Sequence, residues 1–406
     1  RLFVTAGLRV DGNSAFGKDF GLQAYPKLSF SYVMSDHDFW PEWWETLKLR
    51  AAVGEAGKAP GAFDASRTWE PIAGDEGKPG FTPDQIGNPN LGPERTREIE
   101  LGFESSAFGG RLGAELTYFH QRTLDALVQV RYPPSQGFQN RQLENVGELE
   151  NQGIELRLDG GLIVTPAFDW RVRLNLSTNK SKAIDLAGEQ VSLGLNNWVR
   201  EGYPVPSIWV DKVMNPDEIA DPVVVADTFI GPSYPTRIIG IGTTITLFNR
   251  LTLDVLGEHQ GGYYLQNWTG YQNAIRLVWR PCFKAQQALR AAAAGDPNAL
   301  SGITALERAR CALERTKQNP DYWVEKADFF KLRTASLTYQ LPPQWVRGRS
   351  ASLTLAARNL FKITDYTGVD PEVSDLGDSG LNGLARREYY QLPPARTFLA
   401  TLRVSF

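Results

Sequence analysis

The C-terminal stretch Arg396-Thr397-Phe398-Leu399-Ala400-Thr401-Leu402-Arg403-Val404-Ser405-Phe406 has the pattern of an amphipathic β-strand. Every second residue from Phe398 to Phe406 is apolar, and the positions between them are polar except for Leu399. About ten residues is the length that a tilted strand needs to cross a bilayer. The segment also carries none of the proline or closely spaced charge that protects edge strands of soluble proteins from aggregation. The stretch therefore favours a membrane barrel over a soluble β-sandwich.

The composition of the chain agrees with a barrel and excludes other classes. Its 406 residues are 42% hydrophobic with a mean hydropathy of −0.31, and no apolar run is long enough for a transmembrane helix. A barrel allows such a low hydropathy because alternate residues face a polar lumen. The net charge is −3 and the basic residues are scattered, which argues against nucleic acid as a partner.

Period-two alternation recurs along the whole chain and predicts about twelve strands of similar length. In most of them one face is apolar and the other carries charges of both signs. The predicted strands are 2–11, 26–34, 46–56, 95–105, 111–121, 152–162, 168–178, 236–247, 250–260, 329–340, 351–361 and 396–406.

The connections between these strands alternate between short and long without exception. The short ones are 35–45, 106–110, 163–167, 248–249 and 341–350, and the long ones are 11–25, 57–94, 122–151, 179–235, 261–328 and 362–395. A transmembrane barrel has this arrangement, with short periplasmic turns and long extracellular loops. The strand-like segment 203–213 would break the alternation, so we assign it to a loop. Phe248-Asn249 is predicted to be a two-residue hairpin turn.

Loop 261–328 is predicted to be a helix-containing extracellular loop. Helices are expected at 283–294, which is rich in alanine, and at about 301–317. The two cysteines of the chain, Cys282 and Cys311, lie before the first helix and within the second. Either a disulfide joins them or both are free thiols, and we expect the disulfide because this loop would lie outside the cell.

Several motifs resemble SusC/RagA-type TonB-linked outer-membrane transporters. They occur in family order from one end of the chain to the other. The matching stretches are Arg9–Gly17, Tyr25–Tyr32, Leu47–Gly54, Asn88–Glu94, Asn151–Leu156, and Ala357–Phe361 followed by Asp365–Glu372. The last pair, with the pattern N-L-F…Y-x-G-x-D-P-E, is the most specific of them.

The resemblance implies a 22-stranded antiparallel transmembrane barrel filled by a plug domain. Residues 1–406 would be its C-terminal portion, and the plug, the TonB-contacting segment and the other strands would lie upstream. The sequence begins with a strand-like segment and has no initiator methionine or signal peptide, which agrees with this expectation. The implied partners are TonB, acting through the plug, and a SusD-like surface lipoprotein that closes the barrel as a lid.

In such a barrel, the apolar face of the last strand is interpreted as a membrane-assembly signal. Barrel-assembly machinery would recognise it first, and outer-membrane lipid would then cover it. The residues of this signal are Phe398, Leu402, Val404 and Phe406.

The aromatic segment Gly261–Tyr271 contains the candidate substrate contacts. Flat rings can stack on sugars or clamp peptides, whereas tyrosine and tryptophan also form girdles at membrane interfaces. For each residue both interpretations remain open. The candidates are Tyr263, Tyr264, Trp268 and Tyr271.

No pattern of catalytic or metal-binding residues is found. His37, His120 and His259 are far apart, and neither a G-x-S-x-G nor an H-E-x-x-H motif nor a P-loop is present. We therefore predict no enzyme, metal or cofactor, and instead outer-membrane import of a nutrient such as an oligosaccharide or a peptide. The alternatives are a passive porin or adhesin-type barrel and, third, a secreted β-rich enzyme.

Overall fold

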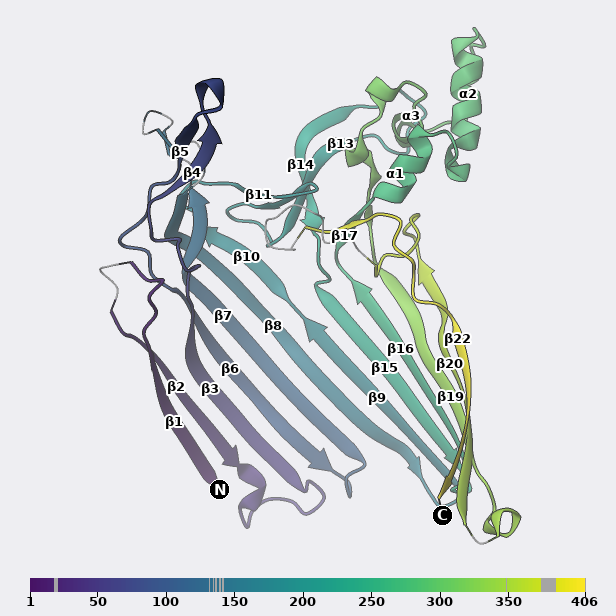
Figure 1. Cartoon of the computed structure of the whole chain (residues 1–406). Coiled ribbons are helices and arrows are strands. Elements are labelled where there is room, and N and C mark those ends of the chain that lie inside the picture. Colours follow the sequence, from purple (N-terminus) through teal and green to yellow (C-terminus); the bar gives the residue numbers. More distant parts are fainter. Residues whose placement is uncertain are drawn as a thin grey trace. The chain divides into compact units, whose positions relative to one another are not determined.

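The structure, a computed structural model, describes the chain except for residues 18–20, 131, 134, 136, 139, 141, 348, 374–384 and 406. The chain divides into two compact units. The first comprises Arg1–Gly160, Asn175–Val191 and Val199–Val205, and the second comprises Gly161–Leu174, Ser192–Trp198 and Pro206–Phe406. Antiparallel strands dominate both units (Figure 1).

The first unit contains a sheet with the order β1-β2-β3-β6-β7-β8, in which neighbouring strands are antiparallel. β10 pairs with β8, and β4 and β5 form a separate hairpin. The strands are β1 (Leu2–Asp11), β2 (Gln23–Val33), β3 (Thr46–Lys58), β4 (Thr68–Ala73), β5 (Pro79–Gln85), β6 (Glu94–Ala107), β7 (Leu112–Val130), β8 (Gln142–Val164) and β10 (Lys180–Asp185).

The second unit contains a sheet with the order β9-β15-β16-β19-β20-β22. Its strands are β9 (Phe168–Thr178), β15 (Arg237–Leu247), β16 (Leu251–Gly261), β19 (Phe329–Gln340), β20 (Ser350–Thr364) and β22 (Thr397–Ser405). The printed pairs from β15 to β22 are all antiparallel.

The long connections fold into smaller elements. One four-stranded sheet has β11 (Val191–Gly194), β12 (Asn197–Val199), β13 (Ser207–Val213) and β14 (Val224–Pro232). A three-stranded sheet has β17 (Tyr264–Asn267), β18 (Val324–Lys326) and β21 (Arg387–Glu388). The α-helices are α1 (Trp268–Ile275), α2 (Phe283–Ala293) and α3 (Ala305–Arg310), and short 3-10 helices lie at 34–36, 75–77, 280–282, 315–317, 320–323 and 343–346.

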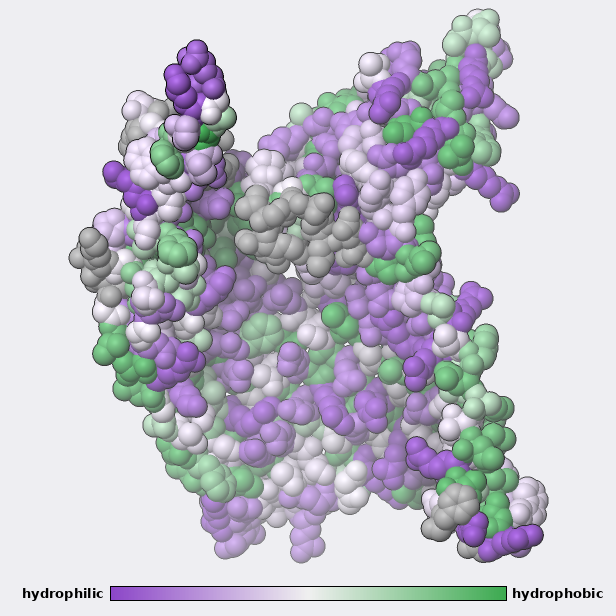
Figure 2. Space-filling model, in the orientation of Figure 1, coloured by the Kyte–Doolittle hydropathy of each residue, from purple (hydrophilic) through white to green (hydrophobic). Residues whose placement is uncertain are grey.

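Large apolar side chains are exposed at alternate positions of the sheet in the second unit. Leu253, Leu337 and Leu355 are paired across β16, β19 and β20 and are 37%, 40% and 51% exposed. At most of the intervening positions the side chains are polar, and the hydroxyls of Thr338 and Thr354 are hydrogen-bonded at 2.9 Å. Exposed leucines on one face of a sheet and polar side chains on the other face are typical of strands whose leucine face contacts lipid. Figure 2 shows hydrophilic residues distributed widely among the strands on the visible face.

All twelve predicted wall strands correspond to strands, but β7 and β8 are longer than predicted. β7 extends to Val130, and β8 begins at Gln142, so most of the predicted loop 122–151 is strand. The extension bends at Asp125, which has a φ of 55°, and the register shifts there. Beyond the bend Val128 is buried with Leu186, which gives this part of β7 a hydrophobic core of its own.

Segment 203–213 was predicted to lie outside the wall, and its strand β13 indeed belongs to the four-stranded sheet. The turn after β15 differs in length from the prediction, because Leu247 pairs with Leu251 and three residues lie between them. Phe248 and Asn249 both have positive φ, at 51° and 54°, as a type I′ turn requires.

The helix predictions are partly wrong. Helix α2 agrees with the prediction at 283–294, whereas α3 covers only Ala305–Arg310 of the predicted 301–317. A capping box between Thr304 and Glu307 begins α3, and the chain leaves the helix at Cys311, which is bonded to Cys282.

Helix α1 was not predicted, because its glycine and aromatic residues are weak helix formers. Tertiary contacts stabilise it instead. The Asn267 side chain accepts a hydrogen bond from the Gly270 amide at 2.7 Å. A Cβ atom at Gly270 would lie 2.7 Å from the Trp323 ring, so only glycine allows this close packing.

Candidate functional site in the second unit

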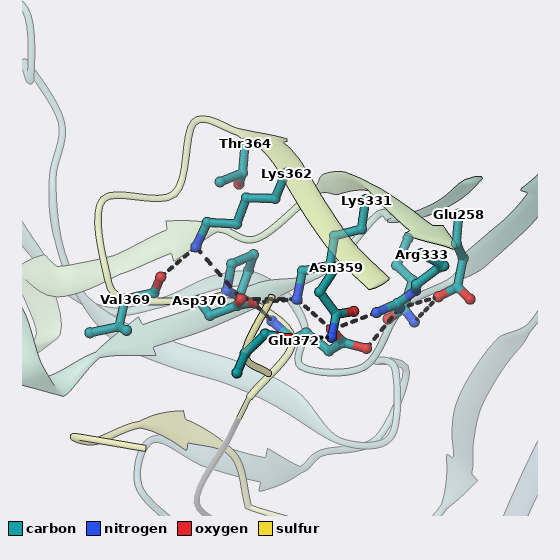
Figure 3. A network of polar contacts seen from close by, with 12 residues as sticks. Glu258, Lys331, Arg333, Asn359, Lys362, Thr364, Val369, Asp370 and Glu372 are labelled. Atoms are coloured by element: carbon teal, nitrogen blue, oxygen red, sulfur yellow. Dashed lines mark hydrogen bonds and ion pairs between the residues drawn. The ribbon is translucent and has the colours of Figure 1, made fainter. Parts of the chain in front are cut away.

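The motif Asp365–Glu372 folds back against β19 and is held there by buried charges (Figure 3). The Lys331 ammonium lies 2.8 Å and 2.9 Å from the two carboxylate oxygens of Asp370, and it also contacts Glu372. Arg333 bridges Glu372 and Glu258 at 2.8 Å and 2.6 Å. Lys331 and Asp370 are 4% and 3% exposed, so each charge depends on its partner.

The charge of Glu372 is also fixed by this network. Burial raises the pKa of its carboxyl group, but the hydrogen bonds and positive charges of Arg333 and Lys331 outweigh burial and hold that pKa below its usual value. Glu372 therefore keeps its negative charge to lower pH than an ordinary glutamate does. The network anchors the loop to β19 and β16.

The same motif supports the segment that leads into α1. Tyr263 is fully buried with Leu265, Phe329 and Tyr366, and its hydroxyl donates a hydrogen bond to the Pro371 carbonyl at 2.9 Å. Burial raises the pKa of the Tyr263 hydroxyl, so it remains a donor. Tyr263 consequently exposes no ring face in this structure, and substrate contact was one of the two interpretations that the sequence left open for it.

Parallel pairing of β17 with β21 brings residues 264–271 beside residues 387–390. Gln266 pairs with Arg387, and Asn267 pairs with Glu388. Thr269 connects the two segments further, because its hydroxyl donates to the Glu388 carboxylate at 2.6 Å and accepts from the Tyr390 amide at 2.7 Å.

Four aromatic side chains meet where these two segments join, and we call them the aromatic platform: Trp268, Tyr271, Tyr389 and Tyr390. The Trp268 ring centroid lies 5.2 Å from that of Tyr271 and 6.4 Å from that of Tyr389, and Tyr389 lies 5.2 Å from Tyr390. Tyr390 is 47% exposed, and the other three rings are partly exposed. Such a set of accessible rings can stack on the faces of sugars or clamp the side chains of a peptide.

The residues predicted as substrate contacts therefore have different surroundings. Trp268 and Tyr271 belong to the platform, whereas the ring of Tyr264 lies against Gly231, where a Cβ atom would come within 2.6 Å of it. Sequence reasoning missed Tyr389 and Tyr390, although the run Arg386-Arg387-Glu388-Tyr389-Tyr390 is a dense polar and aromatic signal in a long loop. Only the pairing of β17 with β21 shows that it adjoins Trp268.

Arg386 and the disulfide hold the surroundings of the platform. The buried guanidinium of Arg386 donates to the Ser233 carbonyl at 3.1 Å and packs 4.8 Å from the Tyr234 ring centroid. Burial lowers the pKa of Arg386. Cys282 and Cys311 form a disulfide with a Cα–Cα distance of 5.3 Å.

The predicted assembly signal lies on an exposed strand. Phe398 and Leu402 on β22 are 75% and 65% exposed, and Val404 is partly exposed. Phe406 lies outside the described residues. Phe398 also lines a shallow apolar hollow with Leu337 and Leu355.

Among the residues that the structure describes, no cluster of three or more His, Cys, Asp or Glu could hold a metal ion. None of the described helices is long and apolar enough to cross a membrane.

The strands, the loop motifs and the relatives together define the class of protein. The family described as "TonB dependent receptor-like, beta-barrel" matches residues 1–360, and the chain belongs to this family. Members of the family are transport receptors of the outer membrane. The expected all-β antiparallel barrel class is confirmed, as is the resemblance to SusC/RagA-type transporters.

Individual relatives agree with this assignment. TonB-dependent receptor P26 of Formosa agariphila is 29% identical over 449 residues, covering 98% of this chain and 44% of the relative. SusC of Bacteroides thetaiotaomicron is 24% identical over 443 residues, covering 100% of this chain and 42% of the relative. The chain thus spans less than half the length of these relatives.

A solved structure has the same fold. The RagAB peptide importer in its closed-closed state superposes with a TM-score of 0.75 at 20% identity, over 100% of this chain and 46% of that chain. The open-open state gives the same TM-score.

Proposed function

We propose that the whole protein imports a nutrient, an oligosaccharide or a peptide, across the outer membrane in a TonB-dependent manner. Family membership over residues 1–360 carries this proposal. A plug domain outside this stretch of sequence would receive the pull of TonB. Trp268 and Tyr271 of the aromatic platform would contact the nutrient.

A SusD-like surface lipoprotein is the proposed partner. The support for it is the similarity to SusC and to RagAB, together with the extensive folded loops around α1, α2 and β13. Barrel-assembly machinery would recognise the apolar face of β22, and lipid would cover it afterwards.

The experiment that tests import uses the full-length protein in a Gram-negative host that lacks its own receptors for the nutrient. We expect uptake of a labelled oligosaccharide or peptide to require both this protein and tonB, and to fall at least several-fold in a Trp268→Ala, Tyr271→Ala double variant. The barrel must reach the outer membrane fraction in each strain.

The alternatives give different results. A passive porin would transport equally well without tonB, and an adhesin would transport nothing. A secreted enzyme would be found in the medium without detergent. Co-purification of a neighbouring lipoprotein with the tagged full-length protein tests the lid separately.

A further inference from the structure

Strand β14 forms an exposed edge of the four-stranded sheet β11-β12-β13-β14 (Figure 1). In the part of the chain that the structure describes, it is paired along one side only, with β13. Three consecutive valines at its beginning, Val223, Val224 and Val225, are 57%, 40% and 48% exposed. Neighbouring side chains of a strand point to opposite faces, so both faces of the strand are uncovered here. Met214 and Ile219 of the adjoining turn are also exposed, which extends the apolar surface.

The backbone of Val224 faces away from β13. The preceding residue, Val223, accepts a hydrogen bond from the Met214 amide at 2.8 Å and donates its amide to the Asn215 side chain at 2.9 Å. Val224 itself pairs with Val213. Hydrogen-bonded and non-hydrogen-bonded pairs alternate along an antiparallel ladder, so the amide and the carbonyl of Val224 lie on the open edge.

The turn beside this edge is acidic. Residues 215–222 contain three acidic residues and no basic one. Asp217 and Glu218 are exposed, and Asp221 pairs with Arg308 at 3.0 Å. Helix α3 holds the turn in place, because the amide of its first residue donates to the Glu218 carbonyl at 2.8 Å. Negative charge therefore stands at a fixed position beside the apolar edge.

We propose that this edge binds an extended segment of a partner protein, which joins the sheet as a further strand. The backbone of the partner bonds to Val224, its apolar side chains cover the valines and Ile219, and its basic residues face Asp217 and Glu218. A second copy of this chain fits less well, because pairing at Val224 would bring two acidic turns close together. The edge shares no residue with the aromatic platform, so the inference goes beyond the proposed function.

The test measures the fluorescence anisotropy of a labelled peptide mixed with the full-length protein in detergent. The peptide is Lys-Val-Thr-Val-Thr-Val-Lys, capped at both ends and carrying a neutral fluorophore. A second peptide has N-methyl groups on its central residues, so it keeps the side chains but cannot donate the backbone hydrogen bonds. A third has glutamate in place of both lysines. We expect the first peptide to bind about tenfold or more tightly than either of the others, because each lacks one part of the recognition.

Variants of the protein separate the backbone from the side chains. Val224→Pro removes the outward amide and leaves the bonds to β13 in place, since proline is tolerated where a strand amide faces solvent. It should weaken binding of the first peptide about tenfold, whereas Val224→Ala keeps the amide and should weaken binding less. Glu218→Gln should weaken binding and reduce its dependence on salt. Glu314→Gln removes an exposed carboxylate elsewhere in the same unit and should change neither.

Strand addition is overturned if the N-methylated peptide binds as tightly as the first, or if Val224→Pro binds the first peptide as the parent does. The assignment of a basic partner is overturned if the glutamate peptide binds equally, or if Glu314→Gln acts like Glu218→Gln. Dimers of the parent that Val224→Pro abolishes would make a second copy the occupant and would also overturn the proposal. Unchanged hydrogen exchange of the β13 amides shows that the sheet of each variant is intact. If Val224→Pro disturbs that exchange, the comparison of the three peptides on the parent decides.

Discussion

At the scale of single residues, the most consequential contact is the ion pair of Lys331 with Asp370. Because both side chains are almost fully buried, Lys331→Met removes the near partner of Asp370 and leaves it only the longer contact to Lys362 at 3.7 Å; breaking a buried pair costs about 3–5 kcal/mol in comparable cases. We expect that loss in urea unfolding of the full-length protein, together with faster proteolysis of residues 365–372. Lys326→Met removes the exposed partner of Asp328 and should cost about 1 kcal/mol or less. Equal losses in the two variants would show that the buried network does not anchor the motif.

Glu388 should make the stability of the platform depend on pH. Burial raises the pKa of its carboxyl group, so the folded platform binds a proton more readily than the unfolded segment does. The contribution of Glu388 to stability therefore falls as pH rises from the ordinary carboxyl value of 4.5 through the higher folded pKa.

Glu388→Gln keeps an oxygen that can accept from Thr269 and removes the titration. We expect this variant to slow hydrogen exchange of the β17 and β21 amides at pH 7, and to flatten the Glu388-dependent change in protection between pH 5 and pH 7. The docked motif provides an internal comparison, because the pKa of Glu372 is lowered and its stabilising effect is lost as pH falls instead. If Glu388→Gln and the parent show the same pH dependence of protection, that dependence does not come from Glu388.

At the scale of elements, two sequence motifs of the first unit form one structure. Gly17, at the end of the motif Arg9–Gly17, donates its amide to the Leu91 carbonyl at 2.8 Å. Asn145 of β8 fixes the second motif by accepting from the Gly92 amide at 2.7 Å and donating to the Gly92 carbonyl at 3.0 Å. Leu91 is fully buried between them. The motifs therefore serve to dock loops onto strands.

Gly17→Ala tests this docking. A Cβ atom at Gly17 would lie 2.0 Å from the Pro89 carbonyl oxygen, so the two loops must separate, at a cost of about 1–3 kcal/mol. Hydrogen exchange at the Gly17 position and the neighbouring loop amides should accelerate, whereas exchange within β6 and β7 should not. Gly21→Ala is the matched control, because nothing lies within 4 Å of its Cβ position. The docking account fails if the two variants exchange alike.

The elements also show what sequence alone can and cannot predict. Strands were predictable because lipid and a polar lumen impose period two on every wall strand, as Leu253, Leu337 and Leu355 illustrate. The platform was only half predictable. Trp268 and Tyr271 are close in sequence, but their meeting with Tyr389 depends on parallel pairing of β17 with β21 across more than one hundred residues. Helix α1 depends on the close contact of Gly270 with Trp323, which periodicity does not encode.

At the scale of the whole molecule, the membrane assignment depends on the direction that the leucine row faces. Leu355 lies on β20 between Leu337 and Ala400, and it is 51% exposed in the structure. If this row contacts lipid, Leu355→Arg places a charge in the hydrocarbon layer, at a cost of about 2–4 kcal/mol near the midplane.

Thr354→Arg adds the same charge one residue earlier, on the face where Thr354 is hydrogen-bonded to Thr338, and is expected to cost less because that face meets a polar lumen. The measurement is the folded fraction of full-length protein inserted into lipid vesicles across a urea series. A larger loss for Leu355→Arg than for Thr354→Arg supports the lipid-facing row. A charge on a lipid-facing side should destabilise the protein more than a charge on a lumen-facing side. The reverse order would therefore mean that the leucines face inward and that the sheet belongs to a soluble core.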